Sequence, residues 1–407
     1  MRILQINSRY EYASTGRAAK ELNDALKEAG IETHIACGEW LLLNNMDSIF
    51  KIGSYADRRL HALLSRITGK QGHFSYFATR KLLKHISKVK PDVVHLLNLH
   101  ANYINFPLLM KYLAKNKIPV VASVHDCWCF TGHCCYFLPH NCYKWQDECK
   151  NCVSVHEGNK SWFFDTSKKM FAEKKQLFSQ IDKLAVVGVS DWITAQAEKS
   201  FLGSYADICR RIYNWVDMQS FYPHREEKGL KKYRNTEGKF IALSVSYEMT
   251  YLKGIDDIIE VAKRLSEDII IIIVGKMDRK RELPDNITVI PSTNNIDELC
   301  GYYSSADVLL NLSHHETFGL VTAEALACGT PAVVYNITAC PEVVGEGCGY
   351  VCEVGDYDGV ADALYEIKKS GKASYSEKCI DYVRQNFNKE NNTKEYIKLY
   401  KEMLEIK

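Results

Sequence analysis

The sequence predicts an α/β protein of two Rossmann-like, doubly wound parallel-sheet domains that face each other across a cleft. Short apolar runs without polar alternation, typical of strands buried on both faces, alternate with amphipathic helical patterns. This rhythm runs through the first half of the 407-residue chain and restarts after a polar, charged segment at 224–239. A chain of this length suggests two or three domains.

The first series of elements begins at the amino terminus. A helix expected at 15–30 places Leu22, Leu26 and Ala29 on one face, as an amphipathic helix against a sheet requires. Uninterrupted apolar runs around it predict buried strands. These strands are expected at 2–7, 31–37, 92–99, 119–125 and 184–190.

The second series has the same composition and ends in an amphipathic helix. Its strands are expected at 240–246, 269–275, 286–290, 306–313 and 331–336, with helices at 254–266 and 319–328. We therefore expect an N-terminal domain over 1–215, a second domain over 216–385 and a C-terminal helix over 386–407. Open parallel sheets bind ligands at the carboxyl ends of their strands, so functional residues should lie on the loops that follow strands.

Composition narrows the class of protein. The chain is 46% hydrophobic and 25% charged, with a net charge of +2, which is ordinary globular composition. Its Lys and Arg residues form no basic patch interleaved with aromatics, so we expect no nucleic-acid partner. The amino terminus lacks a signal-peptide pattern, and no apolar stretch reaches about 18 residues. We expect a cytoplasmic protein with reduced thiols.

The most informative segment is 306–331, "ADVLLNLSHHETFGLVTAEALACGTP". A predicted strand ends at Ser313, a loop carries Glu316, and a helix begins near Gly319. The free amides at a helix start bind anions, and glycine lets a phosphate approach the backbone. Glu324 lies about one turn inside the helix, where a carboxylate can accept hydrogen bonds from ribose hydroxyls. A lone glutamate is usually a surface charge, but a pair placed around this turn indicates a site.

The same segment resembles the signature of a known family. "HETFGLVTAEALACGTP" is similar to the paired-glutamate motif of the retaining GT-B glycosyltransferases of glycosyltransferase family 4, or glycosyl transferases group 1. Four further segments resemble this family, so that the resemblance covers nearly the whole chain: "NSRYEYASTGRAAKELNDAL", "VVGVSDWITAQAEKSFL", "RIYNWVDMQSFYP" and "YLKGIDDIIEVAKRL".

The resemblance implies a retaining transferase that moves a sugar from a nucleoside diphosphate sugar to a saccharide or lipid-linked saccharide acceptor. The setting it implies is cell-surface polysaccharide biosynthesis, such as capsule or lipopolysaccharide. The second domain would hold the nucleotide and the first most of the acceptor, and the final helix would cross back to the first domain. The transfer would need no metal, because cations and amides can balance the charge of the leaving diphosphate.

The resemblance also assigns roles to single residues. Lys253 would supply a cation for the diphosphate, Glu324 would bind the ribose, Glu316 would contact the donor sugar, and His125 would lie near the anomeric carbon. Taken singly, each has an ordinary structural interpretation, and their common position after strands favours a site. The remaining donor-binding residues would be Gly16, Phe318, Gly319, Leu320 and Val321.

The sequence departs from the family at one important position. An Arg usually precedes the Lys by about five residues, but Glu248 stands there and no Arg lies in 240–253. Arg17 and Lys276 are the candidates for a second cation on the diphosphate. Trp215 replaces a common glycine, an effect that we expect to be local.

Two other functions fit the same architecture. A nucleotide-sugar 2-epimerase would convert its substrate without an acceptor, and a non-catalytic sugar-nucleotide binder would tolerate the missing Arg. The identity of donor and acceptor and the oligomeric state cannot be read from the sequence. A predicted helix at 161–178 combines aromatic residues with lysines. It is either an ordinary helix with its aromatics in the core, which we favour, or a peripheral contact with the inner face of a membrane.

Seven of the fifteen cysteines lie in 127–152, which we expect to be an insertion on the acceptor side. The spacing Cys134-x7-Cys142-x6-Cys149-x2-Cys152 supplies four ligands for tetrahedral zinc, with His133 and His140 in reserve. A subset of the family has a similar cysteine segment. A structural zinc and buried free thiols are the two interpretations left open. A catalytic thiol is not expected, because glycosyl transfer needs no such nucleophile.

Overall fold

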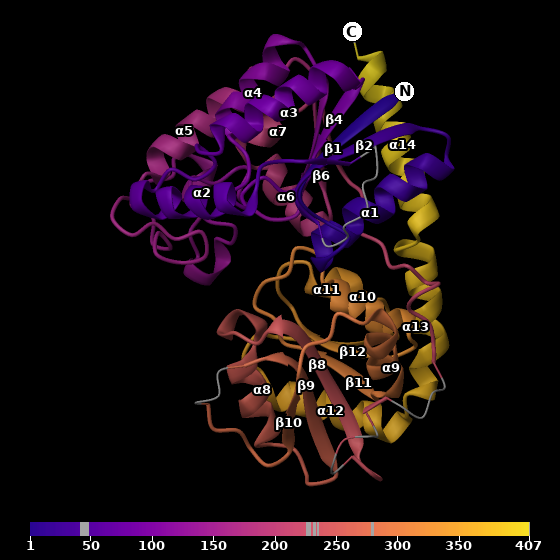
Figure 1. Ribbon diagram of the computed structural model, residues 1–407. Coiled ribbons are helices and arrows are strands. Elements are labelled where there is room, and N and C mark those ends of the chain that lie inside the picture. Colours follow the sequence, from indigo (N-terminus) through magenta and orange to yellow (C-terminus); the bar gives the residue numbers. More distant parts are fainter. Residues whose placement is uncertain (41–48, 225–228, 231–232, 234–235, 278–280, 407) are drawn as a thin grey trace. The chain divides into compact units, whose positions relative to one another are not determined.

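The computed structural model describes the whole chain except residues 41–48, 225–228, 231–232, 234–235, 278–280 and 407 (Figure 1). It divides into two compact units, residues Met1–Ile212 with Glu390–Lys407, and residues Tyr213–Lys389. The predicted polar boundary segment at 224–239 lies partly outside the described residues. Among the described residues, no helix has the length and apolar character needed to cross a bilayer.

The first unit contains a seven-stranded parallel sheet in the order β3-β2-β1-β4-β5-β6-β7. The order reverses between β1 and β4, which pair from Ile3 beside Val93 to Ile6 beside Leu96. Such a switch point opens a crevice at the carboxyl ends of the two strands. The strands are β1 Arg2–Tyr10, β2 Glu32–Trp40, β3 Ile49–Lys51, β4 Val93–Leu96, β5 Val120–Val124, β6 Leu184–Gly188 and β7 Ile208–Arg211.

Helices cover both faces of this sheet, with α3, α4 and α5 on one side and α1 and α14 on the other (Figure 1). The last helix is anchored through β4 and β5. The Tyr400 hydroxyl lies 2.8 Å from His95 Nδ1, and Ser123 Oγ lies 2.7 Å from His95 Nε2. The helices are α1 Ala13–Glu28, α2 Tyr55–Thr68, α3 Tyr76–Val89, α4 Phe106–Lys115, α5 Ser167–Phe178, α6 Asp191–Glu198, α7 Phe201–Tyr205 and α14 Lys389–Glu405.

The second unit contains a six-stranded parallel sheet in the order β10-β9-β8-β11-β12-β13. Its switch point lies between β8 and β11, where Val308 pairs with Ala242. Ile269 to Val274 are at most 1% exposed, which fits a central strand covered on both faces. The strands are β8 Phe240–Glu248, β9 Ile269–Lys276, β10 Ile287–Ile290, β11 Val308–Asn311, β12 Ala332–Tyr335 and β13 Gly349–Cys352.

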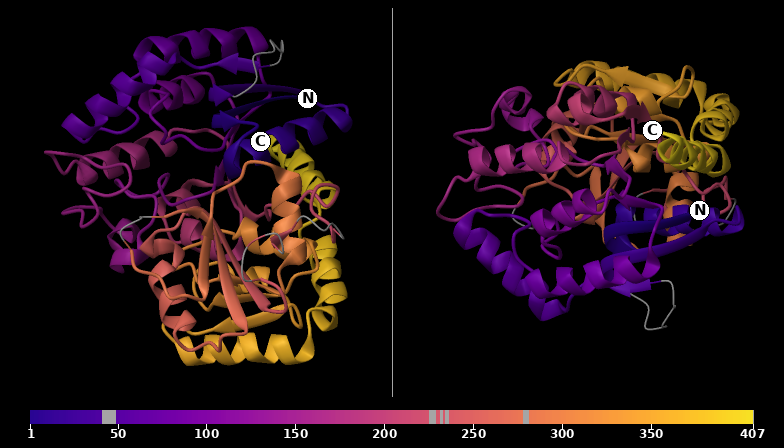
Figure 2. Two further views of the ribbon diagram at one scale, coloured as in Figure 1. Left: turned by 60° about the horizontal axis from the view of Figure 1, so that its bottom comes forward. Right: turned by 90° about the horizontal axis from the view of Figure 1, so that it is seen from above.

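Helices again form two layers, and Figure 2 shows them from two further sides. Residues of α8 and α12, including Ile258 and Leu364, share one hydrophobic cluster with β8, β9 and β11. The α9, α10 and α13 helices lie on the other face (Figure 1). The elements are η4 Tyr251–Lys253, α8 Ile255–Ala262, α9 Ile296–Ser305, α10 Leu320–Ala327, α11 Cys340–Val343, α12 Tyr357–Ser370 and α13 Ala373–Asn386.

The doubly wound parallel sheets confirm the predicted fold class, with two kinds of difference. The β3, β7 and β13 strands were not predicted, because they are short edge strands without a long apolar run. The helix predicted at 161–178 begins only at Ser167. Met170 and Phe171 are buried, as expected for a helix packed on a core, whereas Trp162 to Phe164 lie before the helix and are exposed.

Candidate active site

Lys253 lies on the turn between β8 and α8, where this turn passes close to the end of β11. Gly254 has a φ of 73°, and a Cβ atom there would lie 2.1 Å from the carbonyl oxygen of Leu312. The His314 amide donates a hydrogen bond of 3.0 Å to the carbonyl of Leu252. Glycine is therefore required for the two loops to pack, and their packing places Lys253 beside the loop that follows β11.

The structure brings Lys253 and Glu316 into an ion pair, with Lys253 Nζ 2.5 Å from Glu316 Oε1. The side chains are 35% and 16% exposed, so the lysine remains open to an anion from solvent. This pair sits at the carboxyl ends of β8 and β11, the two strands that form the switch point. A ligand of the second sheet is expected at that position.

A strained threonine holds Glu316 in place. Thr338 Oγ1 accepts a 3.0 Å hydrogen bond from the Glu316 amide, and the Ala339 amide donates to the Glu316 carbonyl at 3.2 Å. Thr338 has a φ of 53°, in the left-handed region that β-branched residues rarely adopt. Strain of this kind persists where surrounding structure enforces it, often at functional sites.

The start of α10 follows directly. Gly319 has a φ of 97° and precedes the first helical residue, Leu320, so that the amides of Leu320 and Val321 belong to the helix start. The nearest atom to a Cβ built on Gly319 would be 3.8 Å away, which leaves room for a ligand group. The Phe318 side chain is only 2% exposed and packs against Tyr213 and Phe387. Only the backbone of Phe318 is therefore available to a sugar-nucleotide ligand.

Glu324 lies inside α10 and is 3% exposed. Its Oε2 accepts a 2.9 Å hydrogen bond from the hydroxyl of Tyr303 on α9. This contact fixes the direction of the carboxylate. A ribose would have to reach it from the side that Tyr303 does not occupy.

A buried polar network supports the loops around Lys253. Asp257 Oδ2 lies 2.7 Å from His314 Nε2, and the Tyr335 hydroxyl donates to Asp257 Oδ1 at 2.9 Å. Burial opposes ionisation of Asp257, but the hydrogen bond to His314 contributes to a lowered pKa. The network ties the starts of α8 and of the β11 loop to β12.

Lys276, a candidate second cation, ends β9 beside Glu248 in the strand register. Its Nζ donates a 2.8 Å hydrogen bond to the Tyr247 hydroxyl and lies 4.5 Å from the centre of that ring. It therefore projects from the same edge of the second sheet as Lys253. Arg17, the other candidate, lies on α1 in the first unit.

Gly16 and His125 belong to the first unit. Gly16 is in the first turn of α1, where a Cβ atom would lie 3.3 Å from Arg9 Cβ and 3.4 Å from the backbone of Tyr10. Asn7 Nδ2 donates a 2.9 Å hydrogen bond to the Thr15 carbonyl and fixes this turn. His125 follows β5 directly, and burial lowers its pKa to about 4, so its ring is neutral at pH 7.

A charged cluster lies next to His125. His100 Nε2, which follows β4, is 2.8 Å from Asp126 Oδ2. Burial opposes the charge of His100, but Cys135 and Asp126 raise its pKa well above the ordinary value. Ligand atoms of His100, Asp126 and Cys135 all lie within 4.8 Å of one another. This cluster connects the cysteine-rich segment to the carboxyl ends of β4 and β5.

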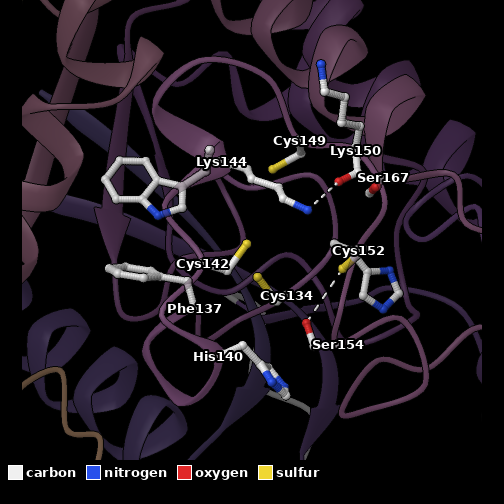
Figure 3. A pocket seen from close by; sticks show the side chains of 12 residues that line it. Cys134, Phe137, His140, Cys142, Lys144, Cys149, Lys150, Cys152, Ser154 and Ser167 are labelled. Carbon is white, nitrogen blue, oxygen red and sulfur yellow. Dashed lines mark hydrogen bonds between the residues drawn. The ribbon is translucent and has the colours of Figure 1, made fainter.

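The predicted zinc ligands Cys134, Cys142, Cys149 and Cys152 line one pocket of the first unit (Figure 3). They belong to the cysteine-rich segment between β5 and α5, and all fifteen cysteines of the chain are free thiols. His133 and His140 line the same pocket.

Sequence reasoning missed three residues that shape this site. Gly254 belongs to the "LKGID" segment, and its close approach to β11 could have been suspected from a glycine after the lysine. Asp257 is indistinguishable in sequence from an exposed helix residue. Thr338 gives no signal at all, because nothing about a threonine suggests a positive φ.

The two doubly wound parallel sheets are those of the GT-B fold. Among solved structures, sucrose-phosphate synthase from Thermosynechococcus elongatus superposes with a TM-score of 0.69 at 16% identity, covering 99% of this chain and 98% of the other. That likeness concerns the fold alone.

The chain belongs to Glycosyltransferase Family 4: that family model matches residues 15–220, and the model of glycosyl transferases group 1 matches residues 226–386. Enzymes of this family are retaining and use nucleotide sugars.

Two curated relatives resemble the chain at low identity. The putative colanic acid biosynthesis glycosyl transferase WcaC of Escherichia coli is 23% identical over 365 residues, covering 86% of each chain. The N-acetyl-alpha-D-glucosaminyl L-malate synthase of Bacillus anthracis is 28% identical over 207 residues. That match covers 47% of this chain and about half, 53%, of the relative's length.

Proposed function

We propose that this protein transfers a sugar, with retention of anomeric configuration, from a nucleoside diphosphate sugar to a saccharide or lipid-linked saccharide acceptor. The setting is cell-surface polysaccharide biosynthesis, which the likeness to a putative colanic acid biosynthesis transferase supports. The observation that carries the proposal is the Lys253–Glu316 pair at the switch point of the second sheet, directly before the start of α10.

In the proposed reaction, the bond between the anomeric carbon and the diphosphate oxygen breaks, and that oxygen keeps the electron pair. The acceptor hydroxyl oxygen forms the new bond on the same face of the sugar, and its proton passes to the departing diphosphate. Lys253 and the amides of Leu320 and Val321 stabilise the charge that develops on the diphosphate. Lys253 leaves Glu316 to do so, which frees the Glu316 carboxylate for the donor sugar hydroxyls.

The remaining roles in this proposal are those that the family resemblance implies. Glu324 accepts hydrogen bonds from ribose hydroxyls on the side away from Tyr303, and Lys276 is the second cation from the second unit. His125, neutral at pH 7, hydrogen-bonds the sugar, and Gly16 lets the first turn of α1 approach the phosphates.

The transfer itself needs no metal in this proposal, because Lys253 and helix amides meet the charge of the leaving group. Any zinc would be structural and confined to the cysteine-rich segment of the first unit.

For its location, we propose a cytoplasmic protein that contacts the inner face of a membrane peripherally. The support is an exposed aromatic run before α5: Trp162, Phe163 and Phe164 are 44%, 69% and 57% exposed. Such side chains favour the membrane interface. Vesicles with anionic lipid should pull down the full chain but not the Phe163→Ser/Phe164→Ser double variant, and equal recovery of both would rule this contact out.

The donor class is tested by incubating the purified chain with UDP-, GDP-, ADP- and TDP-sugars and measuring release of the nucleoside diphosphate. One donor class should be hydrolysed slowly without acceptor. Lys253→Ala and Glu316→Ala should each reduce this release about 100-fold or more, as loss of an active-site charge does.

Matched controls are Lys263→Ala, at the far end of α8, and Glu267→Ala, on an exposed loop. Both should retain wild-type rates. Unchanged rates in Lys253→Ala and Glu316→Ala would contradict the assigned site. Conversion of the sugar nucleotide to an epimer without acceptor would indicate an isomerase, and tight binding without turnover of any donor would indicate a binder.

A further inference from the structure

The segment between β5 and α5 has little regular structure of its own. From His125 to Thr166 its only helical elements are two single-turn 3-10 helices, η1 Leu138–His140 and η2 Lys144–Gln146. A loop of this length without a helix or strand is uncommon in a compact domain. It does bury aromatic side chains, since Phe130, Phe137 and Trp145 are at most 1% exposed and pack on one another. All of its cysteines are free thiols, so no disulfide joins its parts.

Four thiols of this segment surround one pocket. In Figure 3 the sulfurs of Cys134, Cys142, Cys149 and Cys152 lie around it, those of Cys134 and Cys142 next to each other in this view, and the Lys144 side chain extends between Cys149 and the other three. All four residues are half-buried, so they are neither fully enclosed in the core nor fully exposed to solvent. They come from separate parts of the loop, so a shared ligand would fasten those parts together.

We propose that Cys134, Cys142, Cys149 and Cys152 bind one zinc ion in a closed, tetrahedral site that holds the acceptor-side loop in shape. Four thiolates are a complete ligand set for structural zinc, and no position remains for water or substrate. On binding, the four thiols release their protons to solvent. This inference is independent of the proposed transfer reaction, since none of these residues is assigned to the donor.

Neighbouring groups hold the proposed ligand residues in place through hydrogen bonds. The Gly132 amide donates a 3.2 Å hydrogen bond to Cys149 Sγ. The Cys152 amide donates a 2.7 Å hydrogen bond to Asp165 Oδ2, just before α5. A Cβ atom on Gly132 would lie 2.3 Å from the carbonyl oxygen of Ser167. The loop is thus already packed against the start of α5 where the metal would fix it.

Two lysines near the pocket carry charge opposite to that of a thiolate site. A zinc ion on four thiolates has a net charge of about −2. Lys144 lines the pocket, and its Nζ donates hydrogen bonds to the carbonyls of Lys150 and Asn151 at 3.2 and 3.0 Å. Lys174 of α5, 1% exposed, donates hydrogen bonds to the carbonyls of Trp128 and Thr131 at 2.6 and 3.0 Å. These two cations offset part of the negative charge without being ligands.

The competing metal position is the cluster of His100, Asp126 and Cys135. Among the described residues, this cluster is the group in which three possible ligand atoms lie within 4.8 Å of one another. The four pocket thiols are spaced more widely, so they would have to move inward around an ion. The cluster is occupied by its own hydrogen bonds, however. His100 bonds to Asp126 and lies 2.8 Å from Asn98 Nδ2, and Asn159 Nδ2 donates to Cys135 Sγ at 3.3 Å.

The test is metal analysis of the full chain, expressed with zinc in the medium and purified without metal-affinity chromatography. We expect about one zinc per chain, retained through gel filtration. Cys149→Ser and Cys152→Ser should each lose it, whereas the matched variant Cys135→Ser should retain it. Wild-type chain with well under one zinc, even after zinc is added back, overturns the proposal. So does loss of zinc in Cys135→Ser with retention in Cys149→Ser.

Cobalt substitution of the wild-type chain covers the case in which the serine variants do not fold. Cobalt on four thiolates should give the intense visible and charge-transfer absorption of a tetrahedral, all-sulfur site. Weak absorption, typical of higher coordination by nitrogen and oxygen, would place the metal at the other cluster and overturn the assignment.

Discussion

At the scale of single residues, the site depends on positions where the backbone permits only certain side chains. Gly254 lets the η4 turn lie against the end of β11, and Gly319 turns the chain into α10 with a φ of 97°. Neither glycine supplies a reacting side chain. Gly254 determines where Lys253 lies, and Gly319 determines where α10 begins after Glu316.

Gly254→Ala should therefore destabilise the second unit. The new Cβ atom would lie 2.1 Å from the Leu312 carbonyl oxygen, and a φ of 73° is unfavourable for alanine. We expect a loss of about 2 kcal/mol or more in the free energy of unfolding, measured by urea denaturation. Gly301→Ala is the matched control, because nothing lies within 4 Å of its Cβ position inside α9. It should stabilise by up to about 1 kcal/mol, and equal losses in both variants would contradict this account.

Thr338 gives a second prediction at this scale. Thr338→Val keeps the shape of the side chain but removes the acceptor for the Glu316 amide. A lost hydrogen bond of this kind costs the folded state about 1 kcal/mol, so the unfolding midpoint should fall slightly and donor hydrolysis should fall roughly fivefold as Glu316 loses its position. Thr293→Val, which removes an acceptor for the Asn295 amide on the half-buried loop before α9, should leave hydrolysis unchanged. Wild-type hydrolysis in Thr338→Val would show that this contact does not position Glu316.

At the scale of elements, α14 is fastened to the first sheet through a buried histidine. His95 is enclosed by Tyr400, Ser123 and Tyr396, whose ring centre lies 5.3 Å from that of His95. Burial lowers its pKa from 6.5 to about 3, with a smaller effect of His125. The anchor therefore requires a neutral imidazole.

Acidification should loosen this anchor. Between pH 6.5 and about 3, the unfolded chain binds a proton at His95 that the folded chain does not, so the free energy of unfolding falls as the pH falls. Within this range, His95 changes the free energy of unfolding by up to about 1.4 kcal/mol per pH unit. Above pH 6.5 its effect on the pH dependence vanishes. When denaturation is measured at pH 7.5 and 5.5, the free energy of unfolding should fall less between these two pH values in His95→Gln than in wild type. Tyr400→Phe, which keeps the histidine, should keep the wild-type drop. An undiminished drop in His95→Gln would refute the assignment.

At the scale of the whole molecule, the first unit is built from both ends of the chain. Residues 390–407 return to it after the second unit is complete, and they supply the buried side chains Leu399, Tyr400 and Met403. A destabilising substitution in α14 should therefore weaken the seven-stranded sheet of the first unit. The six-stranded sheet of the second unit, which precedes α14 in sequence, should be less affected.

Leu399→Ala tests this arrangement. Leu399 is fully buried, so its truncation should cost about 2–4 kcal/mol. In hydrogen exchange, protection should fall in β4 and β5 and remain unchanged in β8 and β9. Leu404→Ala is the control on the same helix, because Leu404 is 41% exposed. Equal loss of protection in both units would mean that they unfold together.

Much of the fold and part of the site were predictable because they follow from local patterns. Continuous apolar runs exist only where strands are covered on both faces, so the parallel sheets could be read directly. The spacing of Glu316 and Glu324 reflects a short loop and the first turn of a helix. The edge strands and the start of α5 could not be placed, because half-exposed strands and aromatic loops lack a distinctive pattern.

The sequence by itself determined the two doubly wound domains, the family and the segments that carry the chemistry. Only the tertiary structure decided which side chains meet: the pairing of Lys253 with Glu316, the strained Thr338 behind it, and the burial of Phe318. The physical reason is that periodicity and turn chemistry act over a few residues. Contacts between loops far apart in sequence arise only when the sheets bring their strand ends together.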